Sequence, residues 1–205
     1  MKVRLAALGS TRGTDLRAII DAIEGGKLDA EIVLVFSNKA DAYILERARK
    51  HNIETLFIDH RKYGKREDFD RLVVAALKER KADIVLLIGY MRIISPYFCR
   101  EFEGRIWNIH PSLLPKYAGG MDTNVHEEVL KNKEKETGCT LHVVSEKVDA
   151  GRIIMQEKVK VLGNDTPDSL KERVQKAEQQ LLIKAIKLFS EGKLNIRDLV
   201  KSKGR

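Results

Sequence analysis

Two side chains whose types and spacing suit acyl transfer lie close together in the sequence. Asn108 and His110 are two residues apart at the end of a short apolar segment, 105–109. If that segment is a strand, both side chains project from the same face. An amide N–H can stabilise a developing oxyanion, and an imidazole can move the proton of an attacking amine. The pattern equally fits a structural histidine in an irregular loop, since Pro111 and Pro115 follow.

Asp149 is a candidate partner for His110, although sequence spacing alone does not bring the two together. It lies in the segment Lys-Val-Asp-Ala-Gly, 147–151, where an aspartate beside a glycine ordinarily forms a turn. A carboxylate close to His110 would favour the imidazolium and raise the pKa of the histidine. The interpretation is therefore either a turn or an acid that tunes the histidine.

The loop at 9–15 has the composition of an anion-binding turn. Gly9 and Gly13 let the backbone approach a ligand, and the helix expected next offers N–H groups and the positive end of its dipole. The loop has neither the Gly-Lys-Ser/Thr of a Walker loop nor the G-x-G-x-x-G fingerprint. The alternative is a tight turn in which Thr14 or Asp15 caps the helix.

A second segment, 89–96, is apolar and carries one guanidinium, that of Arg92. Such a lip suits a flat ring with an acidic tail. It also fits a buried strand end from which Arg92 extends to solvent.

The elements that must position these residues alternate regularly in the first half. Segments with the apolar runs of buried strands lie at 3–8, 32–36, 55–58 and 84–89. Segments with helical apolar spacing lie at 16–23, 42–51 and 66–81. This alternation predicts a mostly parallel, doubly wound, Rossmann-like sheet with helices on both faces. In such sheets the ligand lies beyond the carboxyl ends of the strands.

The second half predicts an antiparallel continuation of that sheet. A strand at 105–109 precedes a helix at 124–132, and two further strands follow at 140–144 and 152–161. A long helix starts at Pro167 and extends to about Glu191. The predicted fold class is a single α/β domain with an antiparallel C-terminal part.

Composition excludes several classes of protein. The chain has 205 residues, of which 43% are hydrophobic and 33% charged, and it lacks an apolar run long enough for a membrane helix. Its two cysteines, Cys99 and Cys139, have no CxxC spacing, and no signal peptide is expected, so the predicted compartment is the cytoplasm. The net charge of +8 is largely interleaved with acids, which favours a phosphorylated small molecule over nucleic acid.

Taken together, these segments resemble the folate-dependent formyltransferase family over nearly the whole chain. Four stretches carry the likeness most strongly: 36–42, 89–96, 108–117 and 148–151. The pattern Asn-x-His-Pro-Ser followed by a later Val-Asp-Ala-Gly is specific to the family. The first loop and the length favour its glycinamide ribonucleotide branch.

The resemblance implies transfer of the formyl group of 10-formyltetrahydrofolate, the co-substrate, to the amine of 5'-phosphoribosylglycinamide in de novo purine biosynthesis. His110 would donate and accept protons, Asn108 would polarise the formyl carbonyl, and Asp149 would raise the pKa of the histidine. The implied partners are these two small molecules, with no metal, nucleic acid or membrane. A homodimer is compatible with the resemblance.

The resemblance also implies a binding surface for each substrate. Residues expected to hold the ribonucleotide and its phosphate are Arg12, Gly13, Thr14, Asp15 and Glu178. Residues expected to bind 10-formyltetrahydrofolate are Arg66, Met91, Arg92, Ile93, Ile94 and Asn108. Within one domain, 1–205, residues 1–100 would form the phosphate-binding and nucleotide-binding half, 101–190 the catalytic and folate-binding half, and 191–205 a C-terminal tail.

Two segments depart from the family pattern. Residues 11–15 read Thr-Arg-Gly-Thr-Asp where Gly-x-Gly-Ser-Asn is usual, and the carboxylate of Asp15 would repel a phosphate. Asp15 is therefore expected to cap the helix, which leaves backbone N–H groups and Arg12 for the phosphate. Residues 116–124 replace a Pro-Gly and a histidine-bearing stretch.

Three other functions remain open on the sequence alone. The first is formyl transfer to a nucleotide sugar or to methionyl-tRNA, although such enzymes carry additional domains. The second is hydrolysis of 10-formyltetrahydrofolate, which would not require a phosphate loop. The third is a non-catalytic nucleotide-binding or RNA-binding module, for which strongly salt-dependent binding is expected.

Overall fold

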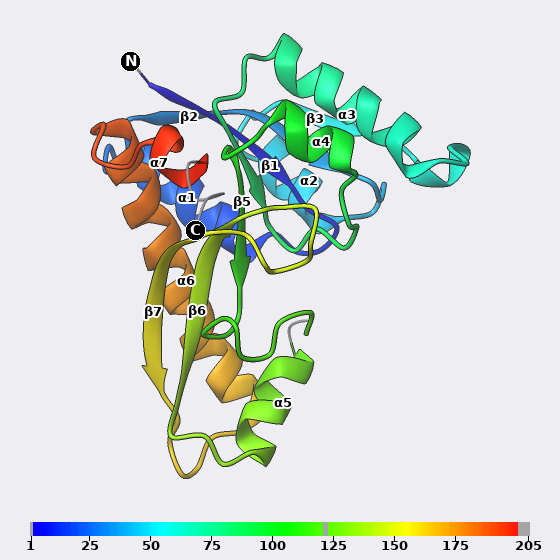
Figure 1. Ribbon diagram of the computed structural model, residues 1–205. Coiled ribbons are helices and arrows are strands. Elements are labelled where there is room, and N and C mark those ends of the chain that lie inside the picture. The colour runs from blue at the N-terminus through cyan, green and yellow to red at the C-terminus, as the bar shows by residue number, and fades with distance from the viewer. Residues whose placement is uncertain (1, 121–122, 201–205) are drawn as a thin grey trace.

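Seven strands form one mixed sheet through the centre of the molecule (Figure 1). The computed structural model describes residues 2–120 and 123–200, so parts of the 116–124 departure and of the predicted tail lie outside the described residues. In chain order the strands are β1 (Val3–Leu8), β2 (Ala30–Ser37), β3 (Thr55–Phe57), β4 (Ile84–Leu87), β5 (Ile106–His110), β6 (Glu136–Val143) and β7 (Ile153–Lys160).

The strand order is β3-β2-β1-β4-β5-β6-β7. Strands β1 to β5 are parallel to one another, β6 is antiparallel to β5, and β7 is antiparallel to β6. This arrangement confirms the predicted fold class. The chain leaves β1 toward one edge and returns to place β4 on its other side. The order therefore reverses between β1 and β4, the position at which open α/β sheets form a ligand crevice.

Helices cover both faces of the sheet, as Figure 1 shows. Their bounds are α1 (Thr14–Glu24), α2 (Tyr43–Arg49), α3 (Arg66–Glu79), α4 (Pro96–Glu101), α5 (Thr123–Lys131), α6 (Pro167–Ser190) and α7 (Ile196–Val200), with a short 3-10 helix, η1 (His60–Lys62). Helices α3 and α4 pack on one face, and α1, α2, α5 and α6 pack on the other. Among the helices of the described residues, none combines the length and apolarity required to cross a membrane.

Strand β1 illustrates why the central strands are apolar throughout. Leu5 and Ala7 belong to the core shared with α1 and α6, whereas Ala6 and Leu8 belong to the core shared with α3 and α4. Successive side chains point to opposite faces, and both faces are covered, so every position of the strand except Arg4 is buried.

Three elements go beyond what the sequence predicted. Helix α4 lies in a segment for which no element was predicted; Ser95 caps it by accepting a hydrogen bond from the N–H of Phe98 (3.3 Å), and Pro96 occupies its first turn. Helix α7 lies within the predicted C-terminal tail, where Leu199 is buried against the core. Strand β6 begins at Glu136 rather than at residue 140, because it pairs along its whole length with β7.

Ser10 joins the loops that follow β1, β2 and β4. Its N–H donates to the carbonyl oxygen of Gly89 (3.0 Å), and its Oγ donates to Oδ1 of Asn38 (2.6 Å). The same Oγ accepts a hydrogen bond from the N–H of Met91 (2.9 Å). Ser10 and Asn38 are both buried, so water does not readily replace these bonds.

We expect Ser10→Ala to lower the free energy of unfolding by about 1–3 kcal/mol, because it leaves the buried amide oxygen of Asn38 and the N–H of Met91 without this partner. Urea unfolding followed by circular dichroism measures the change. The matched control is Ser190→Ala, which removes a hydrogen bond to Lys187 at the partly exposed end of α6 and should cost less than about 0.5 kcal/mol. Equal losses in the two variants would contradict the structural role of Ser10.

Candidate active site

A cavity of about 890 Å³ lies at the carboxyl ends of β1, β4 and β5. Three of the segments that line it follow or end these strands, at 11–15, 87–94 and 108–111. The cavity therefore occupies the crevice at which the strand order reverses, where the fold predicts a ligand.

Most of the predicted site residues meet in this cavity. Those that line it are Arg12, Gly13, Thr14, Asp15, Met91, Arg92, Ile93, Ile94, Asn108, His110, Asp149 and Glu178. Arg66 does not contribute to the lining; it is exposed at the start of α3, and its charge acts on Asp70. A folate-binding role for Arg66 stays a prediction.

The first loop presents the beginning of α1 to the cavity. Gly13 occupies the N-cap position with a left-handed backbone (φ 63°), so the prediction that Thr14 or Asp15 is the cap is wrong. Both residues lie inside the first turn of α1, and Asp15 is buried. Because the first N–H groups of a helix have no intrahelical acceptor, this end favours an anion.

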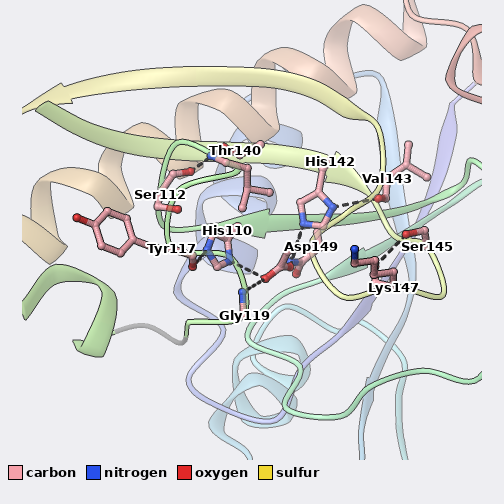
Figure 2. Close-up of polar contacts among 12 residues, drawn as sticks. His110, Ser112, Tyr117, Gly119, Thr140, His142, Val143, Ser145, Lys147 and Asp149 are labelled. Carbon is pink, nitrogen blue, oxygen red and sulfur yellow. Dashed lines mark hydrogen bonds and ion pairs between the residues drawn. The ribbon is translucent and has the colours of Figure 1, made fainter. Parts of the chain in front are cut away.

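His110 is the last residue of β5, and its buried ring lies between two acceptors (Figure 2). Its Nε2 is 2.9 Å from the carbonyl oxygen of Tyr117, and its Nδ1 is 3.4 Å from Oδ2 of Asp149. A carbonyl oxygen only accepts, so Nε2 carries a proton in the neutral ring. A second proton on Nδ1 would face the carboxylate.

Burial lowers the pKa of His110 below its usual range. The charge of Asp149 and the hydrogen bond to Tyr117 act in the opposite direction, while His142 lowers the pKa further. Asp149 therefore has the sign of effect that was expected, but desolvation of the ring outweighs it. The neutral ring predominates at neutral pH.

Asp149 lies in the segment between β6 and β7 and is held ionised by its neighbours. Hydrogen bonding by His142 is the largest cause that lowers its pKa, followed by the N–H of Gly119, which donates to Oδ2 (2.8 Å), and by the charges of both histidines. Its backbone is left-handed (φ 50°). The aspartate is thus a turn residue and a partner of His110 at once, so the two interpretations are compatible.

Asn108 is oriented by His142, which lies directly opposite it on β6. Nδ1 of His142 is 3.0 Å from the carbonyl oxygen of Val143, which only accepts, so that nitrogen carries a proton. In the neutral ring, Nε2 accepts from Nδ2 of Asn108 (3.1 Å); in the protonated ring, Nε2 donates to Oδ1 of Asp149 (3.4 Å). The first of these contacts holds the amide of Asn108, which lines the cavity.

The segment after His110 is held by buried hydrogen bonds to β6 and β7. Oγ1 of Thr140 donates to the carbonyl oxygen of Ser112 (2.6 Å) and accepts from the N–H of Leu114 (2.9 Å). Nε2 of Gln156 donates to the carbonyl oxygen of Leu114 (3.0 Å) and to Oγ1 of Thr140 (2.9 Å). The antiparallel strands, in addition to the prolines, thus fix the backbone that carries Tyr117.

The segment 91–94, which lines the cavity and is called the lip from here on, combines exposed and buried side chains. Met91 and Ile93 are exposed at 47% and 56%, the accessibility expected of a surface that covers a flat ligand. The guanidinium of Arg92 lies 4.9 Å from the ring centroid of Phe69 on α3, and its charge acts on buried Asp70. Arg92 is therefore anchored on the protein and does not extend freely to solvent.

Two histidines of the cavity were missed at the sequence level. His142 contacts both Asn108 and Asp149, and His126, which is buried on α5, lines the cavity. A histidine in the otherwise apolar run at 140–144 was an available signal for His142. No local pattern marks His126, because its approach depends on how α5 packs. Within residues 2–120 and 123–200, no group of three or more His, Cys, Asp or Glu side chains is placed to hold a metal ion.

A Rossmann-like sheet whose switch point holds this amide, imidazole and carboxylate is the arrangement of an acyl-transfer enzyme. The formyl transferase family matches residues 3–186, so the chain belongs to the formyl transferase family. The resemblance seen in the sequence is confirmed.

Within that family, the chain is similar to phosphoribosylglycinamide formyltransferase of Haemophilus influenzae, with 38% identity over 95% of this chain and 91% of that protein. It is 44% identical to the trifunctional purine biosynthetic protein adenosine-3 of Gallus gallus, of which it spans 19%. The phosphoribosylglycinamide formyltransferase structure from Coxiella burnetii superimposes with a TM-score of 0.90 and 38% identity, covering 95% of this chain and 90% of that one.

We expect Asp149→Asn to lower the pKa of His110 further, because the substitution removes the charge that stabilises the imidazolium while burial remains. The population of charged His110 then appears only at lower pH. An NMR titration of the imidazole Cε1–H measures it, with Asp21→Asn on the exposed face of α1 as the control that should leave the titration unchanged. A pKa that stays the same or rises in Asp149→Asn would refute the assigned interaction.

Proposed function

We propose that this chain transfers the formyl group of 10-formyltetrahydrofolate to the amine of 5'-phosphoribosylglycinamide, a step of de novo purine biosynthesis in the cytoplasm. The observation that carries the proposal is that Asn108, His110 and Asp149 face one cavity together with the loop at 11–15 and the lip at 91–94. Relatives named for this activity support the choice of substrates. The two substrates are the proposed small-molecule partners.

The acceptor and the donor occupy different ends of the cavity in this proposal. The phosphate of the acceptor lies at the start of α1, against Gly13, Thr14 and the first-turn N–H groups, and Glu178 on α6 faces its glycinamide end. The folate lies against the lip at 91–94, close to Asn108. Holding both reactants in line contributes roughly 7–11 kcal/mol to lowering the barrier.

Transfer proceeds by direct attack in the proposed mechanism. The amine nitrogen bonds to the formyl carbon, and the carbonyl oxygen becomes an oxyanion. One N–H of the Asn108 amide donates to that oxyanion, and the second hydrogen of the same nitrogen stays with His142. The Nε2–H of His110 donates as well, once the oxyanion replaces the carbonyl oxygen of Tyr117 as its acceptor.

Protons balance within the same site. The bond from the formyl carbon to N10 of the folate breaks, and the proton lost by the amine ends on N10. His110 acts here in its protonated form, with Nδ1–H facing Asp149. Its Nε2 passes a proton toward N10 and takes up, through water, the proton that the amine releases, while the charge of Asp149 stabilises the imidazolium.

The test is a spectrophotometric assay of tetrahydrofolate formation with glycinamide ribonucleotide present or absent. We expect formation to require the amine, and we expect His110→Ala to reduce kcat on the order of 10²–10⁴-fold. The matched control is His51→Ala, which removes a histidine that pairs with Glu24 away from the cavity and should retain full activity. Thermal unfolding of each variant checks that it is folded.

Two outcomes would contradict the proposal. Near-normal turnover by a folded His110→Ala variant would exclude the assigned role of the histidine. Release of formate at the same rate without the amine would identify a 10-formyltetrahydrofolate hydrolase instead.

A further inference from the structure

Helix α2 packs directly against the loop that precedes α1. The N–H of Ile44 donates to the carbonyl oxygen of Thr11 (3.1 Å), next to the start of α2. A Cβ at Gly13 would lie only 2.4 Å from Cγ1 of Ile44, so the glycine is required both for its left-handed backbone and for this close approach. The side of α2 that carries Ile44 therefore forms the wall of the loop.

Arg47 lies on that same side of α2, because residues three apart are neighbours on a helix surface. Its Nε donates to the carbonyl oxygen of Arg12 (3.3 Å), and its side chain lines the cavity together with residues 11–15. The guanidinium also lies 5.3 Å from the ring centroid of Tyr43 on the preceding turn. These two contacts position a cation beside the start of α1.

The chemistry of the guanidinium suits a phosphate at this position. Its Nε is used by the loop, which leaves the two terminal NH₂ groups as donors in the planar fork that matches phosphate oxygens. Arg47 is not a member of the ion pairs observed among residues 2–120 and 123–200. The positive charge is therefore available to an anion that enters the cavity.

We propose that Arg47 is a substrate-binding residue that recognises the phosphate of the acceptor. This inference rests on the proposed function, in which that phosphate lies at the start of α1. The loop contains one carboxylate, Asp15, and one cation, Arg12, so its side chains bring no net positive charge to a dianion. Arg47 adds a positive charge from a neighbouring helix, alongside Arg12.

The test compares three substitutions of Arg47 with two acceptors, glycinamide ribonucleotide and its dephosphorylated riboside. We expect Arg47→Ala to reduce kcat/KM for the ribonucleotide by about 10- to 100-fold through KM, the effect of losing a charge-assisted hydrogen bond. The KM for the folate and the activity on the riboside should stay within about twofold. Arg49→Ala, on an exposed position of the same helix, is the matched control and should match the unmodified chain.

Two conservative variants separate charge recognition from a purely structural role. Arg47→Lys keeps a positive charge and should recover part of the affinity. Arg47→Gln keeps a donor for the carbonyl oxygen of Arg12 but has no charge, and it should remain as impaired as Arg47→Ala. Full recovery in Arg47→Gln, or an equal loss with the riboside, would show that Arg47 only supports the loop and would overturn the proposal.

A binding measurement keeps this test independent of turnover. Calorimetric titration with ribose 5-phosphate should give a dissociation constant about 10- to 100-fold weaker for Arg47→Ala than for the unmodified chain. An unchanged dissociation constant would overturn the role of Arg47 even if formyl transfer is observed. Absence of formyl transfer by the unmodified chain, with the calorimetric difference intact, would instead overturn the proposed function and leave the phosphate site standing.

Discussion

The largely buried carboxylate of Asp149 is the charge around which Asn108, His110 and His142 are arranged. Its side chain is only 10% exposed, and a buried charge is costly unless other groups compensate it. Three groups surround the carboxylate: the N–H of Gly119 from the loop after β5, which donates to it, and the rings of His110 from β5 and His142 from β6, which compensate its charge when they are protonated. The same contacts orient the imidazole and, through His142, the amide of Asn108. The contacts that compensate the charge of Asp149 therefore also set the orientation of His110 and His142.

Backbone geometry makes that arrangement possible. Asp149 has a left-handed backbone, and Gly151 approaches so closely that a Cβ there would lie 1.7 Å from the carbonyl oxygen of Val143. The antiparallel register of β5 and β6 sets His142 opposite Asn108. A shift of one residue in this register would turn His142 to the other face of the sheet and remove both of its contacts. The parallel strand β5 thus carries Asn108 and His110, and the antiparallel strand β6 and the turn after it add His142 and Asp149.

The parallel part of the sheet decides where the cavity lies. Because the strand order reverses between β1 and β4, the loops after these strands line one cavity from both sides. Ser10 joins them through Gly89, Met91 and Asn38, so the loop at 11–15 and the lip at 91–94 share a rigid base. Helix α2 adds Arg47 to the end of the cavity at which we propose that the phosphate binds. The shape of the cavity consequently depends on contacts between strands that are distant in the sequence.

The sequence by itself determined the features that depend on local patterns. Apolar runs and helical spacing gave the alternating elements, and the two-residue spacing of Asn108 and His110 placed both on one face of β5, because strand geometry is a local property. Only the tertiary structure decided that Asp149 reaches His110, that His142 orients Asn108 and that Gly13 replaces Thr14 or Asp15 as the cap of α1. It also decided the net pKa of His110, since burial is set by neighbours from other elements and outweighs the charge of Asp149.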